Sequence, residues 1–280
     1  MSDRPRVGVA VLNYRGAADT IACLASLRAV PEQDDVIVVD NGSNDGSVEA
    51  IRAAAPGVEL VPTGENLGFG RGNNVAIERF LERGCDYVWL LNNDATVEAR
   101  SLGALIDTAT TDERLGAVGS VIYHADRPTE VQTWGGGSVS LRSGRTHDAT
   151  TPCGRVDYIT GASALYRSAA LRDAGAFDPD YFFLYEDVDL GLRLREHGWA
   201  VAVAPESRVW HRGGGTVSAL SPSRAEHHAT SWVLLMRKHA SVPRLRSLTC
   251  LVYYGWLAVR HRRLGIIAGA WRGWRRGWSR

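Results

Sequence analysis

The sequence predicts an α/β protein in which helices flank a mostly parallel, doubly wound central sheet. Short apolar runs alternate with helical stretches from residue 6 to residue 91, and such runs are typical of parallel strands buried on both faces. The pattern then becomes mixed α+β, and the end of the chain is basic and helical in pattern. A chain of 280 residues can bury a full core in one large domain or two small ones.

The first half supplies four strands with helices between them. Apolar runs predict the strands at 6–12, 35–40, 58–61 and 87–91. The helices are expected at 18–30, at 48–55 and from the glycine-rich loop 64–74 to residue 83. Strands that alternate with helices in this way favour a parallel sheet.

The second half has a different composition. A helix at 101–110 and a strand at 117–123 precede a stretch rich in Gly, Ser and Thr at 134–153, which predicts a hairpin or a long loop. Further strands are then expected at 156–166, 200–203 and 207–210. Further helices are expected at 168–174, 186–197 and 223–240. This half is expected to supply loops over one edge of the sheet.

The net charge of +1 hides an uneven distribution. From His227 onward there are ten arginines and Lys238 but no acidic residue, which leaves 32 − 11 = 21 basic against 31 acidic residues before it. The four cysteines are scattered, so their spacing indicates neither a zinc site nor a disulfide framework. The chain enters a strand almost at once and has no apolar run of ~18 residues, so neither a signal peptide nor a spanning helix is expected. A cytoplasmic protein is predicted.

Polar clusters follow each of the four strands, at 13–15, 40–41, 66–74 and 92–94. One such cluster would be an ordinary turn, but ligands of open α/β sheets bind beyond the carboxyl ends of the strands. Tyr14 could stack on a base, and Asp40 could accept hydrogen bonds from a pyrimidine or a ribose. The glycines at 68, 70 and 72 fail the GxGxxG spacing. Arg71 beside them is either a phosphate ligand or a solvated arginine.

Two further features carry chemistry. Asp94 could hold Mg²⁺ or Mn²⁺ with substrate phosphates, or could cap a helix. His211, followed by three glycines, is either structural or a second ligand of that ion. The segment 177–197 holds Asp180 and three acids in a first helical turn, beside an aromatic run that could tune an acid for proton transfer. The three acids are Glu186, Asp187 and Asp189. Simple capping of the helix by these acids is the alternative.

Five motifs in order resemble the family 2 glycosyltransferases, and most closely the rhamnosyltransferase-like branch. They are VVDNGSNDGS, ENLGFGRGNN, WLLNNDA, TGASALYRSAALRDAGAFDPDYFFLYEDVDLGLRLREHGW and VWHRGGGT. The resemblance covers about residues 6–239 and implies the GT-A fold with a Rossmann-like sheet. It implies a domain at 1–225, with a nucleotide-sugar half at 1–115 and an acceptor half at 116–225. A helical, Arg- and Trp-rich segment at 226–280 would follow.

The resemblance also implies roles for particular residues. Nucleotide-sugar contacts would fall on Tyr14, Asp40, Asn66, Arg71, Asn74 and Asn93. The metal motif of the family maps onto residues 92–94, where Asn92 replaces the usual first acid, so that Asp94 and His211 would be the main ligands. Asp187 would be the general base, with Glu186 and Asp189 as alternates.

The implied activity is an inverting, Mn²⁺- or Mg²⁺-assisted sugar transfer to a hydroxyl of a glycan, a polyprenyl-linked molecule or a small natural product. The leading donor is dTDP-rhamnose. Two alternatives stay open. One is a non-catalytic nucleotide-sugar-binding protein, because Asn92 departs from the motif. The other is a sugar-1-phosphate nucleotidylyltransferase, although NYRGAAD after the first strand lacks the expected phosphate loop.

The tail at 244–280 interleaves arginines with tryptophans and aliphatic residues. This composition suits the headgroup zone of an anionic membrane, so a peripheral position on the inner face of the cell membrane is predicted. A helix docked on the body is the alternative. Nucleic acid is not an expected partner, because no recognition fold accompanies the charges.

Overall fold

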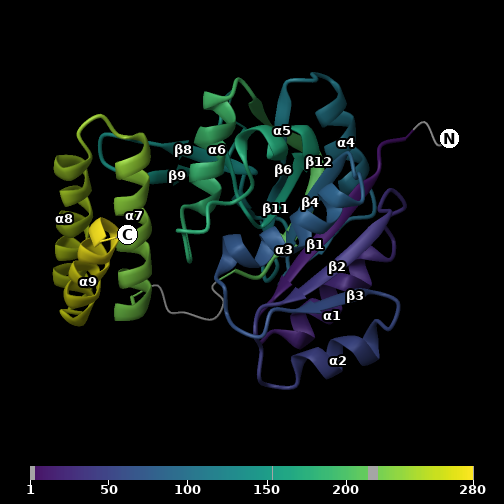
Figure 1. The fold of residues 1–280 in the computed structure, drawn as a ribbon, viewed down its shortest axis with the longest axis horizontal. Coiled ribbons are helices and arrows are strands. Elements are labelled where there is room, and N and C mark those ends of the chain that lie inside the picture. Colours follow the sequence, from purple (N-terminus) through teal and green to yellow (C-terminus); the bar gives the residue numbers. More distant parts are fainter. Residues whose placement is uncertain (1–3, 153, 214–219, 280) are drawn as a thin grey trace.

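The computed structural model describes residues 4–152, 154–213 and 220–279. These residues form a nine-stranded central sheet in the order β3-β2-β1-β4-β11-β6-β12-β5, with β7 paired to β6 (Figure 1). Its strands are β1 (Val7–Asn13), β2 (Asp35–Asp40), β3 (Glu59–Pro62), β4 (Tyr87–Asn92), β5 (Ala95–Val97), β6 (Leu115–His124), β7 (Val131–Thr133), β11 (Ser163–Arg167) and β12 (Ala200–His211). A three-stranded sheet holds β10 (Tyr158–Ile159), β8 (Gly136–Val139) and β9 (Thr146–Asp148).

The helices within the described residues follow the sequence expectation closely. They are α1 (Ala17–Leu27), α2 (Ser47–Ala54), α3 (Phe69–Glu82), α4 (Ser101–Thr110), α5 (Ser168–Ala174), α6 (Glu186–Glu196), α7 (Pro222–His239), α8 (Pro243–His261) and α9 (Gly265–Ser279). The α/β fold class is therefore confirmed. The domain boundary at 225–226 stays a prediction, and α7 spans it.

The parallel half of the sheet places the predicted polar clusters at one edge. Strand β1 lies between β2 and β4 and is parallel to both, so that Asn13 pairs with Asp40 and Leu12 pairs with Asn92. Because all of these strands run in the same direction, their carboxyl ends meet at the same side of the molecule. This edge is the frame for the candidate site.

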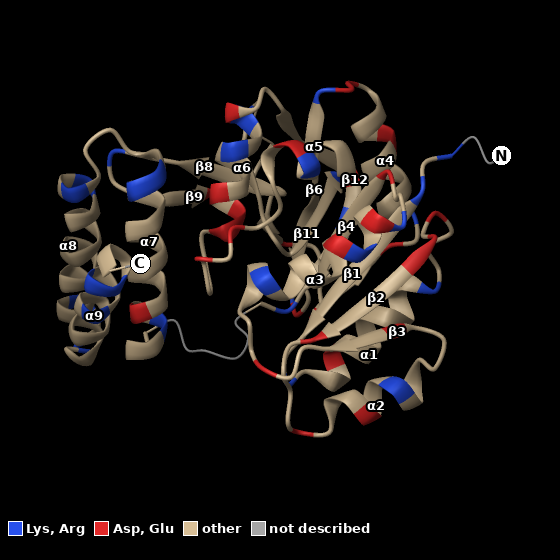
Figure 2. Cartoon of the chain, viewed as in Figure 1, with Lys and Arg blue, Asp and Glu red and all other residues tan. Residues whose placement is uncertain are grey.

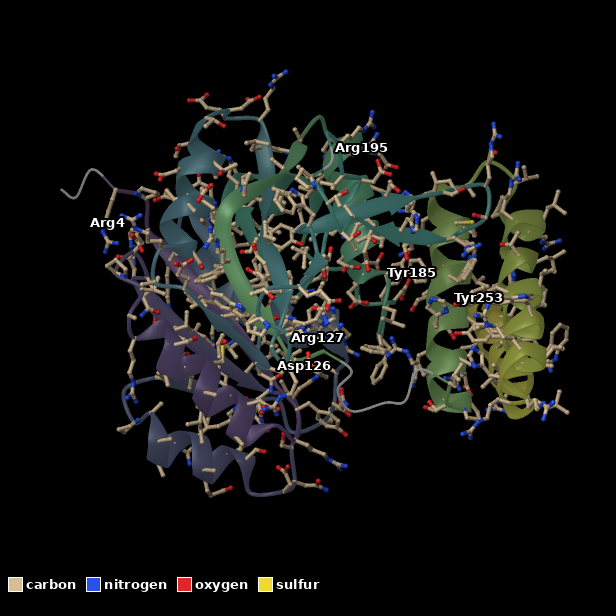
Figure 3. The ribbon with its side chains drawn as sticks, turned by 180° about the vertical axis from the view of Figure 1, so that it is seen from behind. Arg4, Asp126, Arg127, Tyr185, Arg195 and Tyr253 are labelled. Carbon is tan, nitrogen blue, oxygen red and sulfur yellow. The ribbon has the colours of Figure 1, made fainter. Side chains whose placement is uncertain are left out.

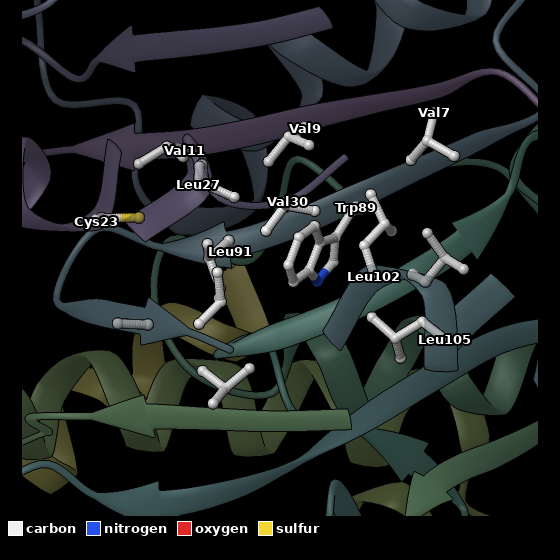
Figure 4. Close-up of a cluster of buried hydrophobic side chains, with 14 of the residues drawn as sticks. Val7, Val9, Val11, Cys23, Leu27, Val30, Trp89, Leu91, Leu102 and Leu105 are labelled. Carbon is white, nitrogen blue, oxygen red and sulfur yellow. The ribbon is translucent and has the colours of Figure 1, made fainter. Parts of the chain in front are cut away.

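Alternating side chains of the buried strands form a core on each face of the sheet. On one face Val9 and Trp89 pack with Leu102 of α4 and with α1 (Figure 4). On the other, Ala10 and Leu90 pack with residues of α3, α5 and α6. Burial on both faces explains why β1, β2 and β4 are nearly continuous apolar runs.

Two sequence predictions in the second half are wrong. The expected strand at 156–166 is two strands in different sheets, β10 and β11, separated by a turn at residues 160–162. The turn contains Thr160 and Gly161, and the strand prediction runs across this break in the apolar run. The expected strands at 200–203 and 207–210 are one strand, β12, whose register with β6 shifts between Ala204 and Arg208. The predicted hairpin at 134–153 is confirmed over the described residues by β8 and β9, while Cys153 lies outside them.

The chain ends in a helical unit formed by α7, α8 and α9, which stands beside the body (Figure 1). Every fourth residue of α9 from Gly265 to Gly277 is glycine, and a Cβ at Gly273 would lie 2.1 Å from the Glu226 carbonyl oxygen of α7. The two helices can therefore approach closely only because these side chains are missing. Among the described residues, none of the helices combines the length and apolarity needed to cross a membrane.

Candidate active site at the carboxyl edge of the sheet

Asn92, Asp94 and His211 come together at the carboxyl edge of the sheet. Strand β5 pairs with β12 so that Ala95 lies opposite His211, which brings the histidine beside Asp94. His211 Nε2 lies 3.1 Å from Asp94 Oδ1 and 3.2 Å from Asn92 Nδ2. Asp94 and His211 are separated by 117 positions in the sequence, so their contact could not be predicted from local spacing. The glycines at 214 and 215 behind His211 lie outside the described residues.

Gln132 of β7 orients the His211 ring. Its Oε1 lies 2.9 Å from His211 Nδ1 and can accept a hydrogen bond from the N–H at that position. The other ring nitrogen, Nε2, faces the Asp94 carboxylate: a protonated Nε2 donates to Asp94, and an unprotonated Nε2 would share a cation with it. Burial acts to raise the pKa of Asp94, but the hydrogen bond and charge of His211 outweigh it and lower the pKa. Asp94 is therefore an anion at neutral pH.

The donor set fits a divalent cation. It combines a carboxylate, an imidazole and the Asn92 amide, which are donors that Mn²⁺ accepts. In the described part of the chain no three His, Cys, Asp or Glu side chains are grouped so that they could hold a metal ion, so the third donor here is an amide. The effect of this neutral donor on cation affinity stays a prediction.

Asp40 lies at the end of β2 and is 1% exposed. Its Oδ1 accepts from Asn13 Nδ2 at 2.7 Å, and its Oδ2 accepts from the Ser43 backbone N–H at 2.9 Å. The side-chain Oδ1 of Asn13 accepts in turn from the Thr20 hydroxyl at 2.8 Å. Asn13 and Thr20 were not singled out for this role by the sequence, in which each looks like an ordinary turn or helix residue.

Two asparagines from the candidate set support the glycine-rich loop. Asn66 Oδ1 accepts from Asn41 Nδ2 at 3.1 Å and from the Gly68 N–H at 2.9 Å. Asn74 Nδ2 donates to the Phe177 carbonyl at 2.7 Å, and its Oδ1 accepts from the Phe177 N–H. These bonds shape the start of α3 and tie it to the segment before α6.

The other members of the set lie around this edge. Arg71 is exposed in the first turn of α3. Tyr14 is half-buried, with the guanidinium carbon of Arg15 5.2 Å from its ring centre. Asn93 Nδ2 donates to the Thr20 hydroxyl at 3.1 Å. Tyr14 and Arg71 therefore keep the accessibility that contact with a nucleotide requires.

Backbone strain precedes the acidic helix. Leu184 and Tyr185 both have positive φ, 68° and 69°, in a region that costs non-glycine residues energy. The Tyr185 hydroxyl donates to the Gly144 carbonyl at 2.8 Å, which anchors this turn to the β8–β9 hairpin. The turn places the first residues of α6 at the positive end of the helix dipole, where carboxylates are favoured.

The three acids of α6 have different environments. Asp189 is fully buried; its Oδ2 lies 2.7 Å from Arg193 Nε and its Oδ1 lies 2.9 Å from His239 Nε2. Burial acts to raise the pKa of Asp189, but His239 and Arg193 outweigh it and lower the pKa. Asp189 is a structural anion and is the weakest of the three candidates for a general base.

Asp187 and Glu186 have raised pKa values instead. Desolvation, with a smaller contribution from neighbouring acids, raises the pKa of both carboxyls. Asp187 is partly exposed, and its Oδ2 accepts from the Gly161 N–H at 3.3 Å. Glu186 is 5% exposed and its Oε2 has no hydrogen-bond partner, so Asp187 is the more accessible of the two.

One turn joins Asp187 to the end of β4, where the candidate cation ligands lie. Gly161 donates to Asp187, and the carbonyl of its neighbour Ala162 accepts from the Asn92 N–H at 3.0 Å. A side chain at residue 161 is excluded, since a Cβ would lie 2.8 Å from the Phe69 ring. The acid of α6 and the end of β4 are therefore held by adjacent residues of the same turn. The sequence did not single out this turn, which lies inside the predicted strand at 156–166, or Gln132, for which no element was predicted.

Comparison with known proteins agrees with these features. Residues 5–234 match a protein-family model described as "Glycosyltransferase like family 2". The chain is 31% identical to the N-acetylglucosaminyl-diphospho-decaprenol L-rhamnosyltransferase of Mycobacterium tuberculosis over 247 residues, which cover 78% of this chain and 80% of that protein. It is 24% identical to the poly-beta-1,6-N-acetyl-D-glucosamine synthase of Staphylococcus aureus over 224 residues, which cover 78% of this chain and 52% of that protein.

Solved structures share the fold. GalNAc-T7 with UDP, GalNAc and Mn²⁺ matches with a TM-score of 0.68 at 12% identity, over 87% of this chain and 50% of that one. The mannosyltransferase PcManGT from Pyrobaculum calidifontis, in complex with GDP-Man and Mn²⁺, matches with a TM-score of 0.62 at 17% identity, over 97% and 88%. At these identities the likeness concerns the fold.

Proposed function

The chain belongs to the family 2 glycosyltransferases, and from this premise we propose that its carboxyl-edge site performs an inverting sugar transfer. The resemblance predicted from the motifs is confirmed: the fold is GT-A, and the protein is a glycosyltransferase that uses a nucleotide-sugar donor. One observation carries the proposed mechanism. The Asp187 carboxylate and the Asn92 end of β4 are held by adjacent residues of one turn.

Asp187 is the proposed general base. Its raised pKa lets it take the proton of an acceptor hydroxyl as the oxygen attacks the anomeric carbon. The attack opposes the nucleoside diphosphate, which leaves with the electrons of the broken C–O bond, so the anomeric configuration inverts. The transition state is oxocarbenium-like. Glu186 is the alternate base, but in its buried neutral form it would leave Asp187 as the nearby anion.

Asp94 and His211, with Asn92, would hold the divalent cation, Mn²⁺ or Mg²⁺. A cation bound there would supply positive charge to the departing diphosphate. Gln132 would keep His211 Nε2 turned toward it. We assign the nucleotide to the neighbouring strand ends, with contacts from Tyr14, Asp40, Asn66, Arg71, Asn74 and Asn93. For Asn66 and Asn74 the bonds within the protein make loop support their larger role.

We infer L-rhamnose, carried by dTDP, as the transferred sugar. The mycobacterial relative, 31% identical over most of both chains, is named for transfer of L-rhamnose to N-acetylglucosaminyl-diphospho-decaprenol. The same name supports a lipid-linked glycan as the acceptor. A cytoplasmic position, with peripheral contact at the inner face of the cell membrane through 244–280, is part of the proposal. Membership of the family disfavours both the nucleotidylyltransferase and the non-catalytic alternative.

The test is transfer by Asp187→Asn compared with the wild type. Purified protein is incubated with nucleotide sugars, Mn²⁺ or Mg²⁺ and a lipid-linked glycan acceptor, and donor binding is measured by calorimetry. Loss of the base is expected to slow transfer by about 100-fold or more while donor affinity stays within a few fold. Asp180→Asn, the same change in the same acidic segment, is the control and should transfer normally. Transfer at the wild-type rate by Asp187→Asn would refute the assignment of the base.

A further inference from the structure

The exposed large hydrophobic side chains of the described residues are concentrated in one part of the chain. All nine lie between residues 242 and 271, and the body up to residue 241 contributes none. They are Val242, Leu245, Leu248, Val252, Trp256, Val259, Leu264, Ile267 and Trp271. Apolar side chains gathered in this way mark an interaction surface, whereas single exposed ones are normal.

Five of them form one stripe on α8, at residues 245, 248, 252, 256 and 259. At 100° per residue they fall within about 80° of the helix circumference. The opposite side of α8 is occupied, because Cys250, Tyr254 and Ala258 are buried against α7 and α9. The helix therefore docks on the protein with one face and presents an apolar face outward. We call these five residues the α8 stripe.

The charge around the α8 stripe has one sign. Arg244 and Arg246 lie at the start of α8, and Arg260, Arg262 and Arg263 lie at its end. No acidic residue occurs after Glu226, and Figure 2 shows α8 and α9 with basic residues only. A protein partner would not need this uniform charge, whereas an anionic lipid surface attracts each arginine near it.

We propose that the α8 stripe lies in the headgroup zone of an anionic membrane, with α8 parallel to the membrane surface. The inference rests on the peripheral membrane contact proposed above and assigns the residues that make it. The side chains at 245–259 enter the boundary between headgroups and acyl chains, and the flanking arginines pair with lipid phosphates. Helix α7 then separates this surface from the body (Figure 1).

The arrangement also places the membrane relative to the site. Helix α7 reaches α6 through His239, whose Nε2 lies 2.9 Å from Asp189 Oδ1, two residues from Asp187. Figure 3 labels Tyr185, directly before α6, and Tyr253 of α8. The ring of His228 in α7 lies between these elements, with its centre 5.1 Å from that of Tyr185 and 6.4 Å from that of Tyr253. A membrane-bound α8 would thus hold the acceptor side of the enzyme at a fixed height above the lipid.

The experiment is flotation of the full-length protein with vesicles. The vesicles are phosphatidylglycerol mixed with phosphatidylcholine, or phosphatidylcholine alone. The stripe variant is Val252→Asp/Val259→Asp, at side chains that are 73% and 75% exposed, so folding should survive. Its matched control, Ala50→Asp/Ala53→Asp, adds the same charges to exposed positions of α2. A second variant, Arg260→Gln/Arg262→Gln/Arg263→Gln, removes charge without touching the stripe.

The wild type and the α2 control are expected to float with the anionic vesicles and to be released by high salt. The stripe variant should bind at least tenfold more weakly, and the arginine variant should lose most of its preference for phosphatidylglycerol. Circular dichroism and donor binding should match the wild type in all variants.

Equal flotation of stripe variant and wild type would overturn the assignment of the stripe alone. A wild type that does not float would overturn the membrane contact itself, while transfer to a soluble acceptor would still report on the glycosyltransferase. A dimer that the stripe variant dissociates would show that a second copy covers the stripe.

Discussion

Glu186, Asp187 and Asp189 occupy one helical turn, and their surroundings separate their roles. Asp189 is paired on both oxygens, and Glu186 is buried with an unpartnered oxygen. Only Asp187 combines partial exposure, a raised pKa and a bond to the turn that reaches Asn92. Three residues of the same chemical kind thus have the environments of a structural anion, a buried acid and, in our proposal, a general base.

The pH dependence of transfer follows from Asp187. Desolvation raises its pKa to about 6. A base must be deprotonated to act, so kcat is expected to rise as the pH rises through that value and to level off above it. The measurement is the pH profile of kcat at saturating donor, compared with Asp189→Asn. That control should keep a rise at the same pH, and a wild-type rate that is flat between pH 5 and pH 8 would contradict the role of Asp187.

Substituting Gln132 tests the proposed cation site without changing one of its proposed ligands. Replacing it by Leu removes the hydrogen-bond acceptor that faces His211 Nδ1. Metal affinity is expected to fall by about 10- to 100-fold, the usual effect of losing such a support. Titration of Mn²⁺, followed by paramagnetic resonance of the free ion, measures this directly. Gln132→Glu keeps an acceptor and should retain affinity; equal binding by all three proteins would speak against a site at His211.

At the scale of elements, α7 is tied to α6 by a buried ion pair. His239 is wedged between Asp189 and Glu196, and these acids outweigh burial and raise its pKa. A raised histidine pKa adds stability that is complete below the unfolded value near 6.5 and is lost as the pH rises through the folded value. The lowered pKa of Asp189 also stabilises the folded protein, and this contribution is present at pH values above those at which an unfolded aspartate titrates.

His239→Gln is therefore expected to destabilise the protein by about 1–3 kcal/mol, because it removes a charged partner from buried Asp189. The loss should be largest near pH 5 to 6 and should shrink toward pH 9, where the wild-type histidine is neutral as well. Urea unfolding at several pH values measures it. Exposed His261→Gln, in the same helical unit, is the control and should change little. A difference independent of pH would mean that His239 contributes packing and not charge.

The glycines of α9 show what periodicity alone can reveal. Residues 265, 269, 273 and 277 are all glycine, and at three of them a Cβ would lie under 3.0 Å from an atom of α7. This spacing is visible in the sequence, although the prediction for the tail rests on its arginines and tryptophans. The tail packs on α7, while its predicted contact with a membrane stays a prediction.

For the whole molecule, the sequence predicted most of what depends on local pattern. The strands and helices up to residue 110 are nearly as expected, because burial on both faces leaves continuous apolar runs. The clusters after β1, β2 and β4 meet at one edge as expected, since parallel strands share a direction. The turn at 160–162 and the partnership of Gln132 with His211 depend on contacts between distant segments, which local pattern does not encode.

Charge is also organised over the whole molecule. All acidic residues except Glu226 lie in the body, and the excess of arginine lies in the helical unit at one end, as Figure 2 shows. Opposite charges at opposite ends give the protein a permanent dipole. Near an anionic surface such a molecule turns its basic end inward before it makes contact, so orientation precedes binding.

The turn at Gly161 has a consequence for the choice of sugar. Adjacent residues hold Asp187 and the end of β4, so the spacing between the proposed base and the proposed cation site is set by two hydrogen bonds and the short backbone segment between them. Under this proposal, a change of donor sugar would have to be accommodated without altering that spacing.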